Sequence, residues 1–160
     1  EGDRLQSTLI LSPPGGGKTT LLRDLIRTVS DGGAHPPLRV GVADERGELA
    51  ALWNGVPQLD VGARTDVMDG CPKGEGLLML LRGMNPQVLA ADELTAPEDC
   101  AALLLAANCG VSLLCTAHAS GLQDLRNRPI YRPLLEGGCF QRLVVLTRRD
   151  GVRACQVSPL

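Results

Sequence analysis

Apolar runs alternate with segments of helical periodicity along most of the chain. Four mainly apolar runs predict buried strands, at 7–12, 36–44, within 85–93 and at 111–118. A fifth run, at 141–149, leads into Asp150-Gly151, which is a strong signal for a hairpin turn. The segment VRACQV after this turn is therefore expected to return as an antiparallel edge strand.

Helical spacing of apolar residues predicts helices at 18–30, at 74–84 and from Thr95 to about Asn108. Thr95 is expected to cap the third helix, with Glu98 as its capping-box partner. Residues 54–72 are rich in Gly, Asp and Pro without a sustained period, and they predict a long loop. Strands that alternate with helices predict an α/β fold whose sheet is mostly parallel.

The length of 160 residues, of which 44% are apolar and 21% charged, is typical of one soluble globular domain spanning residues 1–160. No run approaches the roughly 18 consecutive apolar residues that cross a bilayer. The first residues, EGDRLQ, lack an initiator Met and the features of a signal peptide, and a predicted strand follows almost at once. This abrupt start predicts a fragment of a longer protein.

Composition also argues against two other classes of protein. A net charge of −2 and only three aromatic residues leave little from which to build a nucleic-acid surface by attraction and base stacking. The six cysteines contain no C-x₂-C pair and lie mostly in apolar runs, which disfavours a disulfide framework or a zinc site. Buried thiols in a reducing compartment are expected at Cys71, Cys100, Cys109, Cys115, Cys139 and Cys155.

The segment SPPGGGKTT (Ser12–Thr20, hereafter the phosphate loop) lies between a predicted strand and a predicted helix. Its spacing matches the Walker A pattern G-x-x-x-x-G-K-[ST], with Ser12 in the first glycine position. Glycines let main-chain N–H groups converge on phosphate, and the helix start adds about half a positive charge. A solvated turn is the alternative, disfavoured by the flanking elements. The residues expected to bind nucleotide are Pro14, Gly15, Gly16, Gly17, Lys18, Thr19 and Thr20.

Within this loop, Lys18 is expected to reach the β and γ phosphates, and the Thr19 hydroxyl to ligate Mg²⁺. A second acidic position follows the strand VLAA, where Asp92 is expected to hold the metal through its water shell. Glu93, next to it, could polarise the attacking water. The alternative is that Asp92 and Glu93 merely end a strand ahead of a helix cap.

Polar groups also follow the other two predicted parallel strands. Asp44-Glu45-Arg46 and Glu48 come after RVGVA, and Thr116 and His118 end the strand VSLLCTAH. Each group alone fits a solvated turn or a structural histidine. Because the carboxyl ends of parallel strands share one edge of a sheet, these groups are expected to converge near the phosphate loop.

These four blocks, SPPGGGKTT, ADERGE, VLAADE and CTAHAS, resemble in order the motifs of the secretion-superfamily ATPases of type II and type IV secretion and pilus assembly. The longer segment DVGARTDVMDGCPKGEG is similar to a sporulation branch found in spore-forming bacteria. The resemblance covers roughly residues 8–148. It implies a RecA-like P-loop NTPase domain with three α/β/α layers, ATP or ADP with Mg²⁺ as cofactors, and a missing N-terminal domain.

The resemblance further implies a cytoplasmic ATPase on the mother-cell side that forms a homo-oligomeric, hexameric ring beneath a membrane channel. By similarity, Glu45 and His118 would lie near the γ-phosphate. The acidic block reads DERGE where the wider family has an acidic-proline form, and no tetracysteine zinc element is present. Both Glu45 and Glu93 therefore stay candidates for positioning water.

Phosphoryl transfer gains from an arginine that acts within the chain or across a subunit interface. Arg46, Arg64 and Arg82 are candidates, with Arg64 in the GARTD segment the first choice, and each could instead form a surface ion pair. A ring component that binds nucleotide without hydrolysing it is the competing hypothesis. A small-molecule kinase would need a lid and an acceptor site, and a GTPase would need an N-K-x-D motif that the sequence lacks.

Overall fold

The computed structural model describes residues 4–149 and 151–160. Its main element is a seven-stranded sheet in the order β5-β2-β6-β7-β1-β8-β9, in which every neighbouring pair is parallel except β8 and β9. The strands are β1 (Thr8–Ser12), β2 (Val40–Asp44), β5 (Thr65–Asp69), β6 (Val88–Ala91), β7 (Ser112–His118), β8 (Arg142–Arg149) and β9 (Val152–Pro159). The predicted mostly parallel sheet with an antiparallel C-terminal edge hairpin is confirmed.

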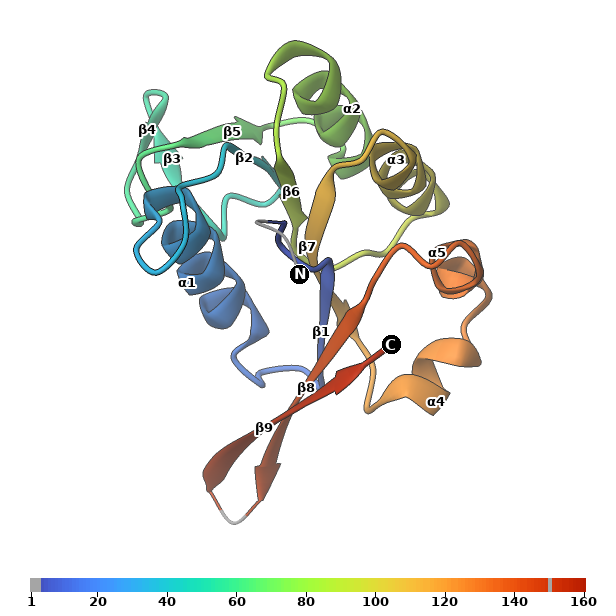
Figure 1. Ribbon diagram of the computed structural model, residues 1–160. Helices are drawn as coiled ribbons and strands as arrows, with labels where there is room; N and C mark the ends of the chain where they lie inside the picture. Colours follow the sequence, from blue (N-terminus) through green and yellow to red (C-terminus); the bar gives the residue numbers. More distant parts are fainter. Residues whose placement is uncertain (1–3, 150) are drawn as a thin grey trace.

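Helices cover both faces of this sheet (Figure 1). They are α1 (Lys18–Asp31), α2 (Lys73–Gly83), α3 (Pro97–Asn108), α4 (Leu122–Arg126) and α5 (Arg132–Glu136), with a 3₁₀ turn η1 (Pro129–Tyr131) before α5. Helix α1 lies on one side of the sheet, and α2, α3 and α5 lie on the other (Figure 1). The fold is therefore the predicted three-layer α/β/α arrangement.

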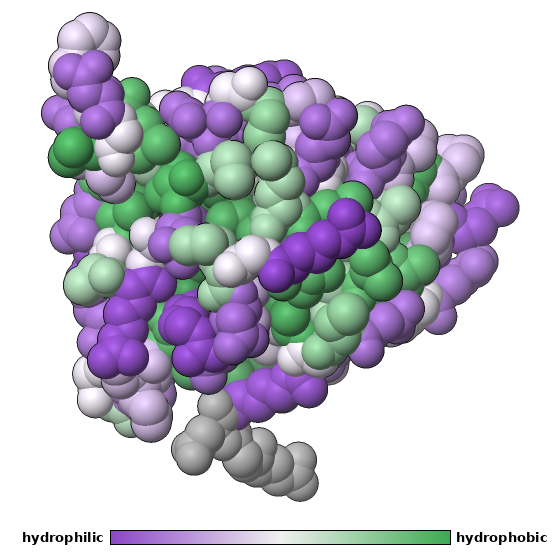
Figure 2. Space-filling model, turned by 90° about the horizontal axis from the view of Figure 1, so that it is seen from above, coloured by the Kyte–Doolittle hydropathy of each residue, from purple (hydrophilic) through white to green (hydrophobic). Residues whose placement is uncertain are grey.

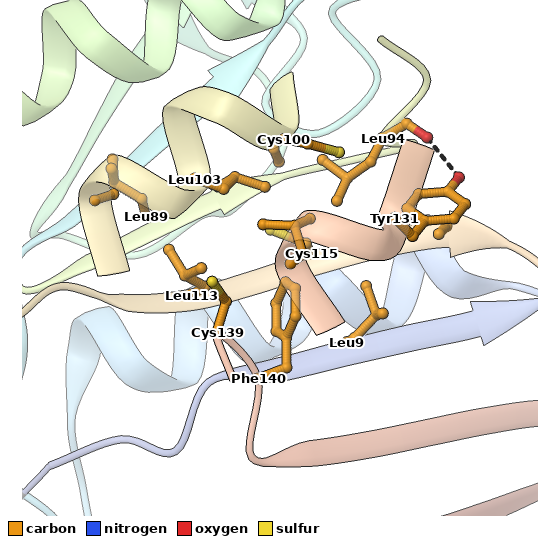
Figure 3. Close-up of a cluster of buried hydrophobic side chains, with 14 of the residues drawn as sticks. Leu9, Leu89, Leu94, Cys100, Leu103, Leu113, Cys115, Tyr131, Cys139 and Phe140 are labelled. Atoms are coloured by element: carbon orange, nitrogen blue, oxygen red, sulfur yellow. Dashed lines mark hydrogen bonds between the residues drawn. The ribbon is translucent and has the colours of Figure 1, made fainter. Parts of the chain in front are cut away.

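Each face of the sheet carries its own hydrophobic core, because successive side chains of a strand point to opposite faces. On β1, Leu9 and Leu11 join the core under α2, α3 and α5, whereas Ile10 joins the core under α1. Figure 3 shows the first of these cores, where the Tyr131 hydroxyl donates a hydrogen bond of 2.7 Å to the main-chain oxygen of Leu94.

Three of the six cysteines lie in the core, two lie at the surface, and Cys71, which was also predicted to be buried, is only half-buried. Cys100, Cys115 and Cys139 are buried in the core of Figure 3, as predicted, and burial raises the pKa of Cys100 to about 11. Cys109 and Cys155 are exposed, so the expectation of buried thiols is wrong for these two. Cys109 directly follows the end of α3, and Cys155 lies on the edge strand β9.

The prediction of a long loop over 54–72 is wrong. Residues Leu52–Trp53 (β3) and Val56–Pro57 (β4) form a two-stranded hairpin, and β5 is a strand of the main sheet. Asn54 and Gly55 both have positive φ, at 49° and 77°, as the type I′ hairpin turn requires. An Asn-Gly pair is the sequence signal for such a turn.

The predicted cap of the third helix is also wrong. Helix α3 starts at Pro97, and the carboxylate of Asp99 accepts hydrogen bonds from the main-chain N–H groups of Thr95 and Ala96. In the C-terminal hairpin, Asp150 lies outside the described residues, and Gly151 has a φ of 80°.

Helices α2 and α3 end near the amino ends of β6 and β7, toward the top of Figure 1, and Figure 2 shows the molecule from above. The surface seen there mixes apolar areas with strongly hydrophilic side chains. Exposed apolar residues of α2 and α3 are Met79 and Leu105, and Met84, which directly follows α2, is exposed as well. The phosphate loop lies at the opposite edge, where β1 ends.

Candidate functional site

The phosphate loop connects the carboxyl end of β1 to the first turn of α1. Gly15 and Gly17 have φ values of 74° and 86°, a conformation that favours glycine. Gly17 directly precedes α1, so the free N–H groups of the helix start point toward the loop. All seven residues predicted to bind nucleotide lie in this loop or in the first turn of α1.

Ser12, the departure from the Walker A pattern, fills space beneath the loop. Its side chain is fully buried, and its hydroxyl donates a hydrogen bond of 2.8 Å to the main-chain oxygen of Pro13. A Cβ placed on Gly16 would come within 2.5 Å of the Ser12 Oγ. The loop thus accepts serine at the first position because the residue above it is glycine.

Three of the predicted catalytic side chains meet at this edge of the sheet. The Nζ atom of Lys18 lies 3.5 Å from Glu93 Oε1 and 3.2 Å from the ring nitrogens of His118. His118 Nε2 lies 2.9 Å from the same Glu93 oxygen. Lys18 is 4% exposed, so its charge is offset by these partners rather than by water. Segments from α1, β6 and β7 build this cluster.

Glu93 has an unusual main chain and a carboxylate held by several cations. Its φ is 49°, in the left-handed region that few residues other than glycine adopt. Burial alone would raise the pKa of Glu93, but the hydrogen bond from His118 and the charges of Lys18, His118 and Arg46 outweigh it and lower the pKa. Arg46 reaches the second carboxylate oxygen at 2.9 Å. Glu93 is therefore ionised at neutral pH.

The residues predicted to hold the metal also meet. The Thr19 hydroxyl donates a hydrogen bond of 2.6 Å to Asp92 Oδ2, and the Thr116 hydroxyl donates to the other carboxylate oxygen. Mg²⁺ prefers oxygen ligands and is commonly held by one or two protein groups plus water and phosphate. A hydroxyl and a carboxylate beside the phosphate loop fit such an ion.

The acidic turn after β2 has a mixed role. The buried carboxylate of Asp44 accepts hydrogen bonds from the N–H groups of Leu49 and Ala50, at 3.0 and 2.8 Å, and so holds the turn together. The contacts of Glu45 are with Lys73, whose main-chain N–H donates to Glu45 Oε2 at 3.3 Å and whose Nζ atom lies 3.8 Å from the same oxygen. The structure therefore brings Glu93, and not Glu45, against Lys18 and His118.

A small hollow separates this acidic turn from the end of β6. It has a volume of about 20 Å³ and is lined by Glu45, Arg46, Lys73, Asp92 and Glu93, among others. That volume is enough for about one water molecule. A larger hollow of about 680 Å³ lies at the opposite edge of the sheet and includes Arg82 in its lining.

The arginine candidates lie in different places. Arg46 contacts Glu93, whereas Arg64 precedes β5 and Arg82 lies in the last turn of α2, both at the amino edge of the sheet. Neither Arg64 nor Arg82 is thus brought to the phosphate loop of its own chain. A cation that the sequence did not indicate is Arg153 of β9, since a Cβ on Gly17 would lie 3.4 Å from its guanidinium. Only the pairing of β1, β8 and β9 reveals that proximity.

Comparison with known proteins identifies relatives of this chain. The family model described as "Sporulation stage III, protein AA" matches residues 2–156. Stage III sporulation protein AA of Bacillus subtilis (strain 168) is 46% identical over 146 residues, which cover 91% of this chain and 48% of that protein. The chain thus spans about half the length of this relative.

Two solved structures share the fold. The VirB11 ATPase of the Brucella suis type IV secretion system, in complex with sulphate, has a TM-score of 0.71 at 19% identity, covering 96% of this chain and 48% of that one. The pilus retraction motor PilT with bound ADP has a TM-score of 0.69 at 14% identity, covering 98% of this chain and 48% of that one. This chain therefore has the same fold as these two proteins.

Proposed function

Since the chain belongs to the sporulation stage III protein AA family, we propose that it is a Mg²⁺-dependent ATPase domain of a sporulation complex. It would act as a homo-oligomeric, hexameric ring that energises or assembles a secretion-like membrane channel. The observation that carries this proposal is the contact of Glu93 with both Lys18 and His118 beside the phosphate loop.

The chemistry follows from the charges at this edge. Lys18 would compensate the phosphate oxygens, and the ionised Glu93 carboxylate would orient a water molecule and accept its proton. The water oxygen bonds to the γ-phosphorus while the bond to the bridging oxygen of ADP breaks. Thr19 and Asp92 would hold Mg²⁺, which neutralises charge on the phosphate oxygens when it is bound.

The fold neighbours support nucleotide binding in general terms. PilT was solved with ADP, and VirB11 with sulphate, an anion that resembles a phosphate group. These proteins share the fold with this chain, and the glycine conformations and helix start described above are suited to the same kind of ligand.

The proposed location is cytoplasmic, on the mother-cell side, with peripheral attachment to channel components. In residues 4–149 and 151–160, no helix combines the length and apolar character needed to span a membrane. The named sporulation relative supports the cellular process.

A nucleotide-binding ring component without hydrolysis is the second candidate, and one observation favours it. Both carboxylate oxygens of Glu93 are engaged, one by His118 and the other by Arg46, each at 2.9 Å. These contacts occupy acceptor sites of the carboxylate that the attacking water would otherwise share.

The test compares two variants with the wild type. Glu93→Gln removes the proton acceptor, so turnover should fall by at least about 100-fold while ATP still binds. Lys18→Ala should abolish ATP binding, measured by equilibrium titration with a fluorescent ATP analogue. A wild type that binds ATP but releases no phosphate at any protein concentration would favour the structural ring component. Unchanged affinity in Lys18→Ala would overturn the phosphate-loop assignment.

A further inference from the structure

Lys73, the first residue of α2, carries an almost completely buried ammonium group. Its side chain is 8% exposed, which is rare for lysine unless the charge is paired. Its Nζ atom donates a hydrogen bond of 2.7 Å to the main-chain oxygen of Glu93. The carboxylates of Glu45 and Asp99 each lie 3.8 Å away. One buried cation thus joins the turn after β2, the end of β6 and the start of α3.

The main chain of Glu93 needs such support. A φ of 49° is an unfavourable conformation for a residue other than glycine, and it persists where surrounding contacts enforce it. Two contacts do so here. The Glu93 N–H donates to Thr116 Oγ1 at 2.8 Å, and its carbonyl accepts from Lys73. Both main-chain polar groups of Glu93 are thus held, and in this conformation its carboxylate contacts Lys18 and His118.

The carboxylates near Lys73 have other partners. Asp99 accepts hydrogen bonds from the N–H groups of Thr95 and Ala96, and Glu45 accepts one from the N–H of Lys73 itself. At 2.7 Å, the contact with the Glu93 carbonyl is the shortest that the ammonium makes with these three residues. The main-chain oxygen of Glu93 is therefore the group that the Lys73 ammonium holds most directly, while the two carboxylates lie farther away.

We propose that Lys73 is a positioning residue that holds the left-handed main chain of Glu93 and thereby keeps its carboxylate against His118. The effect on turnover rests on the proposed ATPase function, whereas the effect on the Glu93–His118 contact does not. Lys73 lies in the segment DVGARTDVMDGCPKGEG, which is separate from the phosphate loop and from the polar motifs at the other strand ends.

The Glu93–His118 contact can be observed directly, because the chain has only two histidines. The ring ¹⁵N resonances of His118 report its hydrogen bond, and exposed His35 serves as an internal reference. The spectrum of Glu93→Ala defines the state without the contact. In Lys73→Met, the His118 resonances should move toward their Glu93→Ala positions while those of His35 stay.

A matched control removes a similar contact elsewhere. The guanidinium of Arg23 donates to the main-chain oxygens of Leu49 and Glu48, at 2.7 and 2.6 Å. Arg23→Met should leave the His118 resonances at their wild-type positions. Lys73→Met should also lower turnover by about 10- to 100-fold with unchanged ATP affinity, because Glu93 is displaced rather than removed.

The outcomes separate the two proposals. Wild-type His118 resonances in Lys73→Met, or shifts of equal size in Arg23→Met, would overturn the positioning role. Absent turnover in the wild type would sink only the ATPase proposal. Should Lys73→Met fail to fold, Lys73→Met/Asp99→Asn removes the carboxylate left buried without its cation, and the same His118 shift is expected from it.

Discussion

At the phosphate loop, the Ser12 side chain and the Gly16 main chain occupy neighbouring space. A methyl group on Gly16 would press against the Ser12 Oγ and Cβ atoms, at 2.5 and 2.6 Å. Gly16→Ala should therefore lower ATP affinity, by about tenfold or more, since the loop must shift to relieve the overlap. Ser12→Gly/Gly16→Ala should recover part of that loss in a nucleotide titration.

The two changes form a double-mutant cycle with Ser12→Gly as its other corner. A double variant whose loss of binding free energy equals the sum of the two single losses would show that the two residues do not interact. Recovery is expected to be partial, because the added methyl group also lies 3.1 Å from the Pro13 oxygen.

Glu93 makes stability depend on pH in one direction. Its pKa is lower in the folded protein than the ordinary value of 4.5, so the folded state favours the ionised form. The resulting stabilisation is complete above that value and is lost as the pH falls through the folded pKa. Below about pH 4.5, the wild type should therefore lose more unfolding free energy than Glu93→Gln does. A difference that stays constant down to about pH 3 would contradict this.

Single residues differ in how far the sequence reveals them. Lys18, Thr19, Asp92, Glu93 and His118 could be predicted because motif spacing and strand ends bring them to one edge. The places of Lys73 and Arg153 depend on contacts between segments far apart in the chain, which no local pattern encodes.

Among the elements, η1 is tied to the end of β6 by one buried hydrogen bond. The Tyr131 hydroxyl donates to the oxygen of Leu94, the residue after Glu93. Tyr131→Phe should destabilise the protein by about 1–2 kcal/mol, because a buried carbonyl loses its partner. Thr8→Val, which removes an exposed hydroxyl contact with Gln6, should cost less. Urea denaturation measures both, and equal costs would argue against a special role for the buried bond.

Physical reasons explain why β5, the β3–β4 hairpin and the cap of α3 could not be predicted from the sequence. β5 reads TDVMD, too polar to predict a buried strand, yet it pairs with β2 at the edge of the parallel strands and is only partly covered. The Asn54-Gly55 turn signal was present, but its flanking strands have two residues each and show no alternation. The α3 cap was misplaced because Asp99 reaches back to the chain from inside the helix.

For the whole molecule, the predicted ring implies that ATP turnover depends on self-association. With Arg64 and Arg82 at the amino edge, either could serve only the site of another subunit. Turnover per chain should therefore rise as the protein self-associates, measured as phosphate release against concentration alongside the mass in solution. A rate per chain that does not rise would exclude an arginine from a neighbour.

Mixing identifies which chain supplies the arginine. Arg64→Ala and Glu93→Gln should each have low turnover alone. In a mixture, some interfaces would pair the intact Glu93 of one chain with the intact Arg64 of another, so activity should partly return. A mixture no more active than its components would assign the arginine role elsewhere, with Arg82→Ala as the next partner to mix.

At this scale, the alternation of strands and helices was sufficient to predict the mostly parallel sheet, and the family resemblance implied the three layers. The strand order was not predictable, because it depends on which helices cross to which face. That order places β1 between β7 and β8, and it carries the C-terminal hairpin past the phosphate loop.

The surface hairpin β3–β4 also determines the tryptophan fluorescence of the protein. Trp53, the single tryptophan, is 70% exposed there, so its indole is already surrounded by water in the folded state. Unfolding in denaturant should hardly shift its emission, and the spectrum is a poor gauge of stability. A shift to shorter wavelength would instead signal that something has covered the hairpin, which makes Trp53 a built-in optical reporter of assembly.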